Sequence, residues 1–134
     1  MNRQGAVGVA RSGEKQPRRK ELIAASADRA NFKEFFPGVS RAVLWGNPDS
    51  GSYGAFTKFV PGVEAGMHTH TNDVWLVVLR GAYLYRDAAG EKRVGSGEFI
   101  RIPGGMKHWS GGDATEGALF YEESSGKFDL VPTN

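Results

Sequence analysis

The stretch GVEAGMHTHTNDVWLVVLRG, residues 62–81, places two histidines directly before the most apolar run of the chain. His68 and His70 are separated by one residue. Alternate residues of a β-strand point to the same face, so both imidazoles can bind one metal ion while Thr69 points to the opposite face. Two imidazoles are half of a metal site, and a third has to come from a neighbouring strand.

The chain holds three histidines, and the third is His108. It follows the turn at residues 103–105, which contains two consecutive glycines. Glycines allow a sharp turn, and such a turn would bring the start of the next strand beside the first pair. From the residues alone two readings stay open: His68, His70 and His108 form a metal site, or the H-x-H pair is exposed or structural, as such pairs commonly are.

Short runs rich in Val, Ile, Tyr, Phe and Trp, separated by Gly, Pro and Asp, follow one another from residue 31 onward. This pattern is typical of an all-β sandwich or barrel. The expected strands are residues 31–36, 40–46, 55–60, 74–80, 82–86, 98–103, 107–112, 118–123 and 127–132. The one candidate for a helix is residues 19–30, and no clear Ser, Thr or Asp cap precedes it.

Two segments of this pattern resemble the paired motifs of the cupin superfamily. The first family motif reads G-x(5)-H-x-H-x(3,4)-E-x(6)-G, and the second reads G-x(5)-P-x-G-x(2)-H-x(3)-N. The chain keeps the motif positions Gly62, His68, His70, Gly81, Gly97, Pro103, Gly105 and His108. It departs from the motifs at Val74, in place of the glutamate, and at Gly112, in place of the asparagine.

The resemblance covers about residues 40–125. It implies a double-stranded β-helix of jelly-roll type, in agreement with the strand pattern. It also implies a metal site made of His68, His70 and His108, the alternative being a cupin that has lost its metal. More narrowly, LWGNPDSGSYGAFTKFVPG (44–62) and EESSGKFDL (122–130) look like small single-domain bacterial cupins without an assigned activity. We therefore expect one cupin barrel domain over residues 21–134.

Val74 sets the expected charge of the site. With a glutamate there, a divalent ion would keep a net charge of +1, whereas three neutral imidazoles leave +2 and up to three open coordination positions. Such a centre favours an anionic or chelating substrate, for example an enolate, a β-dicarbonyl or a carboxylate. Three-His cupin sites occur among dioxygenases that act on chelated substrates, so the resemblance favours Fe²⁺; Zn²⁺, Mn²⁺, Ni²⁺ and Cu²⁺ also suit such ligands.

Several carboxylates lie near the motifs. Asp73 stays open as a fourth ligand if the loop before it breaks the strand alternation; otherwise it is a solvated turn residue. Glu64 is expected to be exposed. Glu122 and Glu123 offer one carboxylate to each face of their strand, so one of them can line the barrel as a general base or lie at its rim.

Other polar and aromatic residues have two readings each. Tyr53, Lys58 and Arg101 are candidates for binding an anionic substrate, although an exposed strand position explains each of them more simply. Trp109, directly after His108, is a candidate for a wall of the pocket.

The remaining apolar residues predict a core and an uncovered outer face. The core is expected to contain Phe56, Phe59, Leu76, Val78, Phe99, Ile102, Leu119 and Phe120. The run at residues 74–79 is apolar on both faces. Its outer face, with Trp75, should pack on a second copy in a homodimer or on the N-terminal segment.

Length and composition exclude other classes of protein. A chain of 134 residues forms one domain with its own core. The absence of cysteine excludes disulfide scaffolds, zinc ribbons and thiol nucleophiles. No apolar stretch is long enough to span a bilayer. We therefore expect a cytoplasmic protein without a membrane partner.

The charge is divided unevenly along the chain. Residues 1–20 contain six basic residues and one acidic residue, a balance of +5, which leaves −3 for residues 21–134. The N-terminal stretch has little to bury and is expected to be a disordered basic tail. Nucleic-acid binding would need a basic face with stacking aromatics on the folded part, and the sequence offers none.

Two classes of function remain open. In the first, the protein is a metal-dependent enzyme acting on a small molecule, either a non-haem Fe(II) dioxygenase or a lyase or isomerase with a Lewis-acid ion. In the second, it is a non-catalytic small-molecule binding or sensor cupin. No obvious proton-transfer residue lies beside the histidines. This absence favours dioxygenase chemistry, or a protein without turnover, over a lyase or isomerase.

Overall fold

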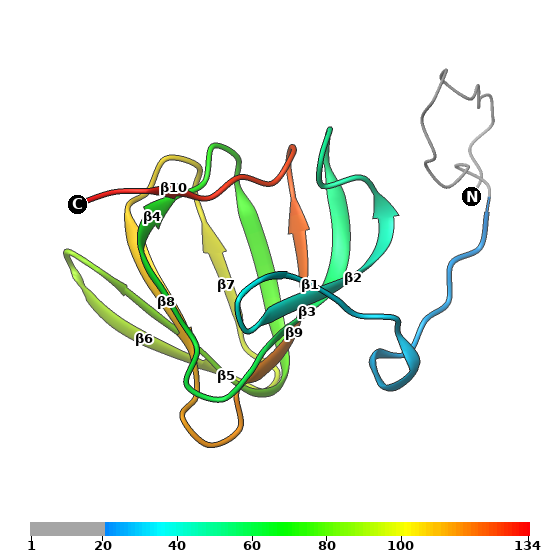
Figure 1. Cartoon of the computed structure of the whole chain (residues 1–134), viewed down its shortest axis with the longest axis horizontal. Helices are drawn as coiled ribbons and strands as arrows, with labels where there is room; N and C mark the ends of the chain where they lie inside the picture. The colour runs from blue at the N-terminus through cyan, green and yellow to red at the C-terminus, as the bar shows by residue number, and fades with distance from the viewer. Residues whose placement is uncertain (1–20) are drawn as a thin grey trace.

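The computed structural model describes residues 21–134, so the expected disordered tail of residues 1–20 lies outside the described residues. The described chain is almost entirely β-structure, as predicted, and its strands form one curled sheet that bends into an open barrel (Figure 1). The strands are β1 (Lys33–Phe36), β2 (Val39–Gly46), β3 (Tyr53–Phe59), β4 (Glu64–Thr69), β5 (Val74–Asp87), β6 (Gly90–Gly95), β7 (Phe99–Ile102), β8 (His108–Gly112), β9 (Ala118–Ser124) and β10 (Val131–Pro132).

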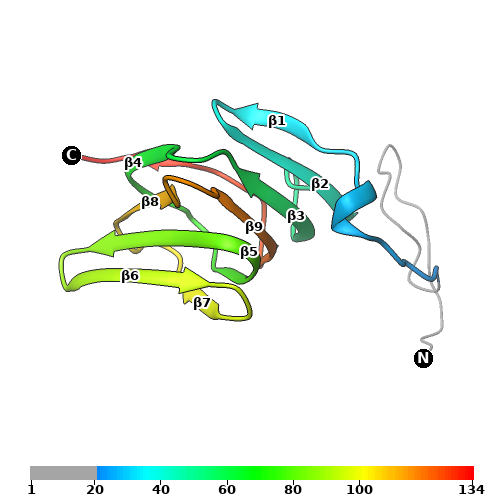
Figure 2. The ribbon, with the colours of Figure 1, turned by 90° about the horizontal axis from the view of Figure 1, so that it is seen from below.

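Strand β5 joins the two halves of the sheet. Its first part pairs with β9 and β7, and through β9 with β3, β2 and β1. Its second part pairs with β6 and β8, and through β8 with β4 and β10. Figure 2 shows β1, β2 and β3 on one side of the molecule and β5, β6 and β7 on the other. The strands curl round the buried core of the barrel.

The length of β5 differs from the prediction of separate strands at 74–80 and 82–86. The structure has a single strand of 14 residues that passes through Gly81. Gly81 has a φ of +73°, and a Cβ there would lie 2.2 Å from the carbonyl oxygen of Gly117. A glycine therefore lets the chain bend against its neighbour without ending the strand.

The core follows the inward positions of the strands. Six of the predicted core residues are buried: Phe59, Leu76, Val78, Ile102, Leu119 and Phe120. Phe56 is half-buried on the outer side, where its ring lies 6.1 Å from that of Tyr121. Phe99 was predicted in the core and is 62% exposed. Alternation along β7 turns Phe99 outward when Ile102 points inward.

The outer face of β5 is only partly covered within the chain. Trp75 and Val77 are half-buried there, and Leu79 is 42% exposed. Phe99 pairs with Val77 across the strands and extends the same apolar surface. That a second copy of the chain covers this surface stays a prediction.

Residues 19–30 form no α-helix in their described part. The structure has one turn of 3-10 helix, Ala27–Arg29, whose Asp28 N–H donates to the Ser26 hydroxyl at 3.3 Å. An α-helix in a small protein is stabilised mainly by burying an apolar face, and this segment has no apolar stripe to bury. A single 3-10 turn can form without such a face. No helix among the described residues has the length and apolar character required to cross a membrane.

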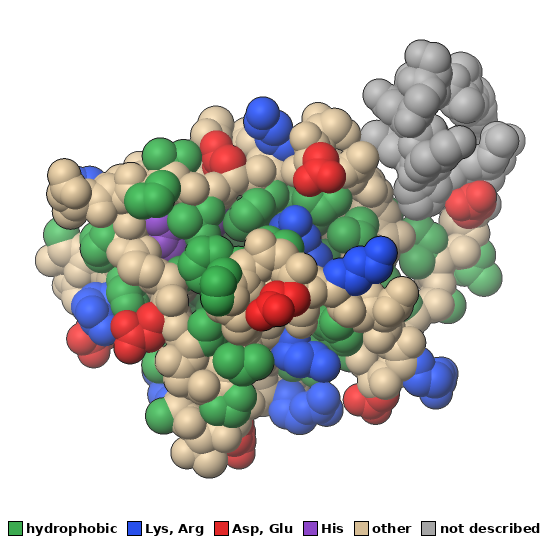
Figure 3. Space-filling model, viewed as in Figure 1, with side chains coloured by type: hydrophobic (Ala, Val, Ile, Leu, Met, Phe, Trp, Pro, Cys, Tyr) green, Lys and Arg blue, Asp and Glu red, His purple; other side chains and the backbone are tan. Residues whose placement is uncertain are grey.

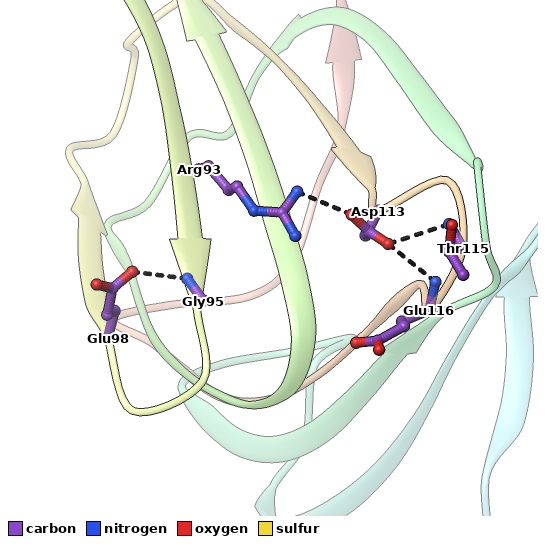
Figure 4. Close-up of polar contacts among 6 residues, drawn as sticks. All are labelled: Arg93, Gly95, Glu98, Asp113, Thr115 and Glu116. Atoms are coloured by element: carbon purple, nitrogen blue, oxygen red, sulfur yellow. Dashed lines mark hydrogen bonds and ion pairs between the residues drawn. The ribbon is translucent and has the colours of Figure 1, made fainter.

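Asp113 organises the turn between β8 and β9 (Figure 4). Its carboxylate accepts hydrogen bonds from the backbone N–H groups of Thr115 at 3.0 Å and Glu116 at 2.9 Å. It also accepts a hydrogen bond from Arg93 on β6 at 2.8 Å. The Glu116 N–H and the Arg93 guanidinium hold the pKa of Asp113 below its ordinary value. One charge thus joins the turn to the neighbouring hairpin.

Replacing Asp113 by Asn should lower the melting temperature at neutral pH, because the variant loses the charge that binds Arg93 and the turn. The pKa of Asp113 lies below its ordinary value of 3.8, so this contribution is present above that pH and is lost as the pH falls through the folded-state pKa. The difference should shrink at low pH, where a protonated Asp and an Asn carry the same charge. Thermal melts followed by circular dichroism between about pH 7 and pH 2.5 measure it. A pH-independent difference would contradict this account.

Candidate metal centre

Strands β4 and β8 bring the three predicted histidines together. The strands are antiparallel, and His68 lies directly opposite His108. A β-bulge between Ala65 and His68 adds one residue to β4. The side chains of Ala65 and His68 are therefore both buried on the inner face. His70 follows the end of β4 and lies on the same side as His68, as strand alternation predicts.

The three rings form a compact group. The ring centroids of His68 and His108 are 4.3 Å apart, those of His68 and His70 are 4.7 Å apart, and those of His70 and His108 are 5.2 Å apart. One nitrogen from each ring lies within 4.8 Å of the others. The cluster could therefore hold one metal ion.

A backbone carbonyl orients each imidazole. The pairs are His68 Nδ1 with Gly66 O at 2.5 Å, His70 Nδ1 with Asp129 O at 2.6 Å and His108 Nδ1 with Met106 O at 2.9 Å. A carbonyl oxygen can only accept, so each Nδ1 carries the proton and each Nε2 keeps its lone pair. Metal-binding histidines in proteins commonly have their second nitrogen held in this way.

Burial favours the neutral form of His68 and His108. It lowers the pKa of His68, and it lowers the pKa of His108 to about 4, with smaller contributions from the neighbouring imidazoles. His108 Nε2 is buried without a hydrogen-bond partner. A buried lone pair without a donor is costly, and a divalent cation would satisfy it. The three residues thus fit a transition-metal ion.

Asp73 joins the two loops that carry the histidines. Its carboxylate accepts hydrogen bonds from the Gly104 N–H at 2.8 Å and from Arg101 at 3.1 Å. These two donors lower the pKa of Asp73, the Gly104 N–H more than Arg101. Beside this contact, the Gly105 N–H donates to the carbonyl of His70 at 2.8 Å. Asp73 therefore lies outside the imidazole cluster, and its alternative reading as a fourth ligand is not supported.

Both glycines of this turn are needed for the contact. A Cβ on Gly104 would lie 2.3 Å from the carbonyl oxygen of Thr71, and Gly105 has a φ of +83°. Gly104 thus permits the close approach of the two loops, and Gly105 permits the backbone conformation of the turn.

The C-terminal segment completes the site, which the sequence patterns did not indicate. It crosses the upper end of the barrel in Figure 1, and β10 pairs with β4. Asp129 binds His70 through its carbonyl, and its carboxylate accepts hydrogen bonds from Thr71 N at 2.7 Å and Thr71 Oγ1 at 2.5 Å. The ring of Phe128 lies 5.6 Å from that of His70. Residues 127–132 were expected as a strand, but only Val131–Pro132 is one.

A cavity extends from the histidines into the barrel. Its walls are mainly apolar and include Val74, Leu76, Ile102 and Phe120. Histidine side chains are visible between hydrophobic ones on the face shown in Figure 3. Val74, at the glutamate position of the cupin motif, thus lines the same cavity as His68 and His70.

Glu122 is the carboxylate that faces this cavity. It is buried, whereas Glu123 is exposed and accepts a hydrogen bond from Tyr121. Tyr53 Oη donates to Glu122 Oε2 at 2.5 Å, and Thr57 Oγ1 donates to Oε1 at 3.0 Å. Burial and then the charge of Glu122 raise the pKa of Tyr53. The simpler reading of Tyr53 as an exposed residue was wrong, because the side chain is fully buried.

The other candidates lie outside the cavity. Arg101 is exposed and pairs with Asp73. Lys58 is exposed, with its Nζ 4.1 Å from the ring centroid of Phe32. Glu64 is exposed, as expected. Trp109 lies under the guanidinium of Arg86, 4.0 Å from its Cζ, and does not line the cavity.

Comparison with solved structures shows the cupin fold. The polyketide cyclase RemF from Streptomyces resistomycificus matches with a TM-score of 0.71 and 16% identity, over 85% of this chain and 87% of that one. KdgF from Halomonas sp. matches with a TM-score of 0.62 and 21% identity, over 78% and 94%. At these identities the likeness shows the fold alone.

A third structure is the complex of Rhodobacter sphaeroides SigE with the anti-sigma ChrR. It matches with a TM-score of 0.62 and 16% identity, over 75% of this chain and 52% of that one. No curated protein sequence matches the chain at a significant level. The family pattern described as the ChrR cupin-like domain matches residues 20–127. The chain belongs to the family of ChrR cupin-like domains, within the cupins.

Proposed function

We propose that the protein binds one divalent transition-metal ion through His68, His70 and His108 and acts as a metal-dependent enzyme on a small anionic or chelating substrate. The observation that carries this proposal is the shared orientation of the three imidazoles, each with Nδ1 bound to a backbone carbonyl, together with the buried and unpaired Nε2 of His108. A bound ion would supply Lewis-acid polarisation of a chelated oxygen or, as Fe²⁺, the redox chemistry of a dioxygenase.

The chain's own residues prepare the cavity for such a substrate. Val74 adds no negative charge beside the imidazoles, so an anionic group on the substrate meets no repulsion there. The apolar walls exclude water and strengthen electrostatic interactions inside the cavity. Glu122, held by the hydroxyls of Tyr53 and Thr57, is the group placed to accept a proton from the substrate.

A second function, ligand sensing without turnover, is favoured by one specific finding. The family pattern is that of ChrR, and the ChrR structure is a complex of an anti-sigma protein with SigE. Under this alternative the same cavity holds a ligand, and the histidines fix its position. The same residues serve both functions, so turnover is the measurement that separates them.

The first test concerns the metal. Protein purified without chelator should contain about one metal ion per chain, and replacing His68, His70 or His108 by Ala should remove most of it, because each loss leaves a divalent ion with only two imidazoles. Circular dichroism should show the β-fold retained. Elemental analysis measures the metal and identifies it.

Ser110→Ala is the matched control. Ser110 is buried on β8, two residues from His108, and lines the same cavity without belonging to the imidazole cluster. This variant should keep its metal. Unchanged metal content in the triple histidine variant would refute the proposed site.

The second test concerns Val74, the apolar residue at the position where the cupin motif has a glutamate as fourth metal ligand. Val74→Glu places a carboxylate beside the imidazoles and should raise metal affinity tenfold or more, about 1.4 kcal/mol. Binding of oxalate, an anionic bidentate probe, should weaken, because the new carboxylate takes a coordination position and part of the charge attraction. Competition with a chelator and oxalate titration measure the two effects.

Val74→Gln is the control for size and polarity, because it has nearly the same shape without the negative charge. The Gln variant should gain less metal affinity than the Glu variant. It should also lose less oxalate binding, because it adds no negative charge. If the Glu and Gln variants fold and behave alike, the charge at position 74 does not act on the metal.

The third test addresses turnover. Oxygen uptake by the Fe²⁺-loaded protein should occur with at least one member of a panel of β-diketones, thiols and catechols, and the His70→Ala variant should lose it. Uptake identical in the two proteins would come from free iron. Binding without uptake or product formation would favour the sensor function.

A further inference from the structure

Arg41 points into the barrel near the cavity. It lies directly opposite Thr57 in the pairing of β2 with β3. Side chains of directly opposed residues lie on the same face of a sheet, and Thr57 is buried and lines the cavity. The guanidinium of Arg41 is therefore on the inner side, although a cation is an expensive group to place there.

Aromatic rings surround this guanidinium. Its Cζ lies 3.8 Å from the ring centroid of Phe35, 4.8 Å from that of Phe128 and 5.4 Å from that of Tyr53. Phe35 and Phe128 line the cavity, and Phe35 is 38% exposed, which puts this group of rings at the mouth. The rings hold the guanidinium plane through cation–π contacts, and the one polar group they bring near it is the Tyr53 hydroxyl, which donates its proton to Glu122.

One guanidinium nitrogen has no partner. Arg41 Nη1 is buried and makes no hydrogen bond. Four other arginines of the described chain form ion pairs with carboxylates, namely Arg80, Arg86, Arg93 and Arg101. No such pair is found for Arg41 within residues 21–134. A buried charged donor without an acceptor is rare in native structures and calls for an absent acceptor.

We propose that Arg41 determines specificity by binding a carboxylate of the molecule that enters the cavity. Guanidinium groups bind carboxylates by two parallel hydrogen bonds, and the orphaned Nη1 provides one of the donors. This inference rests on the proposed function, because it takes the cavity as the ligand site. It goes further by assigning the ligand to the carboxylates and by naming the residue that selects them.

The position of Phe128 connects this carboxylate site to the metal site. Its ring contacts the guanidinium of Arg41 on one side and lies 5.6 Å from the ring of His70 on another. A small acid lying along Phe128 would meet Arg41 with its carboxylate and direct the rest of the molecule toward the histidines. The apolar walls between the two ends suit a hydrocarbon or aromatic body.

The test compares benzoate with benzamide, which has nearly the same shape and no charge. Calorimetric titrations use the full-length protein freed of metal by chelator, so that no ion contributes to binding. Wild type should bind benzoate at least tenfold more tightly than benzamide, since a charge-assisted bidentate contact is lost with the amide. Arg41→Gln should abolish this preference, and Arg41→Lys should keep part of it.

Lys58→Gln is the matched control. It removes a positive charge from β3, the strand that pairs with β2, but from an exposed side chain. It should leave the preference for benzoate unchanged. A loss equal to that of Arg41→Gln would show a general charge effect and overturn the assignment.

Two further outcomes would also overturn it. The first is that wild-type protein binds benzoate no better than benzamide, or binds neither. This outcome can be observed even if the Arg41 variants do not fold. The second is a folded Arg41→Gln protein that keeps the preference. The triple histidine variant should retain the preference for benzoate, so failure of the metal site and failure of the carboxylate site give different results.

Discussion

The contact between the loop at residues 70–73 and the turn at residues 103–105 is the interaction on which the site depends. These loops belong to segments far apart in the sequence, and each carries part of the histidine cluster. The Asp73 carboxylate binds the Gly104 N–H, and the His70 carbonyl binds the Gly105 N–H. Two hydrogen bonds therefore fix the relative position of the segments, and the absence of a side chain on Gly104 lets them approach closely enough to form.

The backbone then sets the direction of each imidazole. Carbonyls of Gly66, Met106 and Asp129 bind the three Nδ1 atoms, so no side-chain carboxylate takes that role. A carbonyl fixes the tautomer as a carboxylate would, but it brings no full negative charge to the site. Together with Val74, this adds no negative charge beside the imidazoles. This absence of negative charge and the inward guanidinium of Arg41, which share Phe128 as a neighbour, both favour the proposed anionic ligand.

Patterns with a short period predicted much of this architecture from sequence. The spacing of His68 and His70 and the strand runs follow from alternation along a strand, which also predicts that one of Glu122 and Glu123 faces inward but not which one. Alternation also explains why Phe99, which hydrophobicity alone places in the core, lies outside. Asp73, Asp129 and Arg41 could not be assigned in this way, because their roles depend on which distant strand or loop lies opposite them. Register between strands is set by the whole sheet, and a single sequence does not encode it locally.

The cavity has different chemistry at its two ends, and this constrains both proposed functions. Imidazole nitrogens lie at one end, Arg41 lies near the mouth, and the Glu122 carboxylate lies on the wall. A molecule held by Arg41 and the histidines at once would have its middle beside the apolar walls. A ligand that makes both of the proposed contacts is a small acid with a second polar group. Because Phe128 contacts both ends, the C-terminal segment is the part of the fold whose packing any such ligand must match.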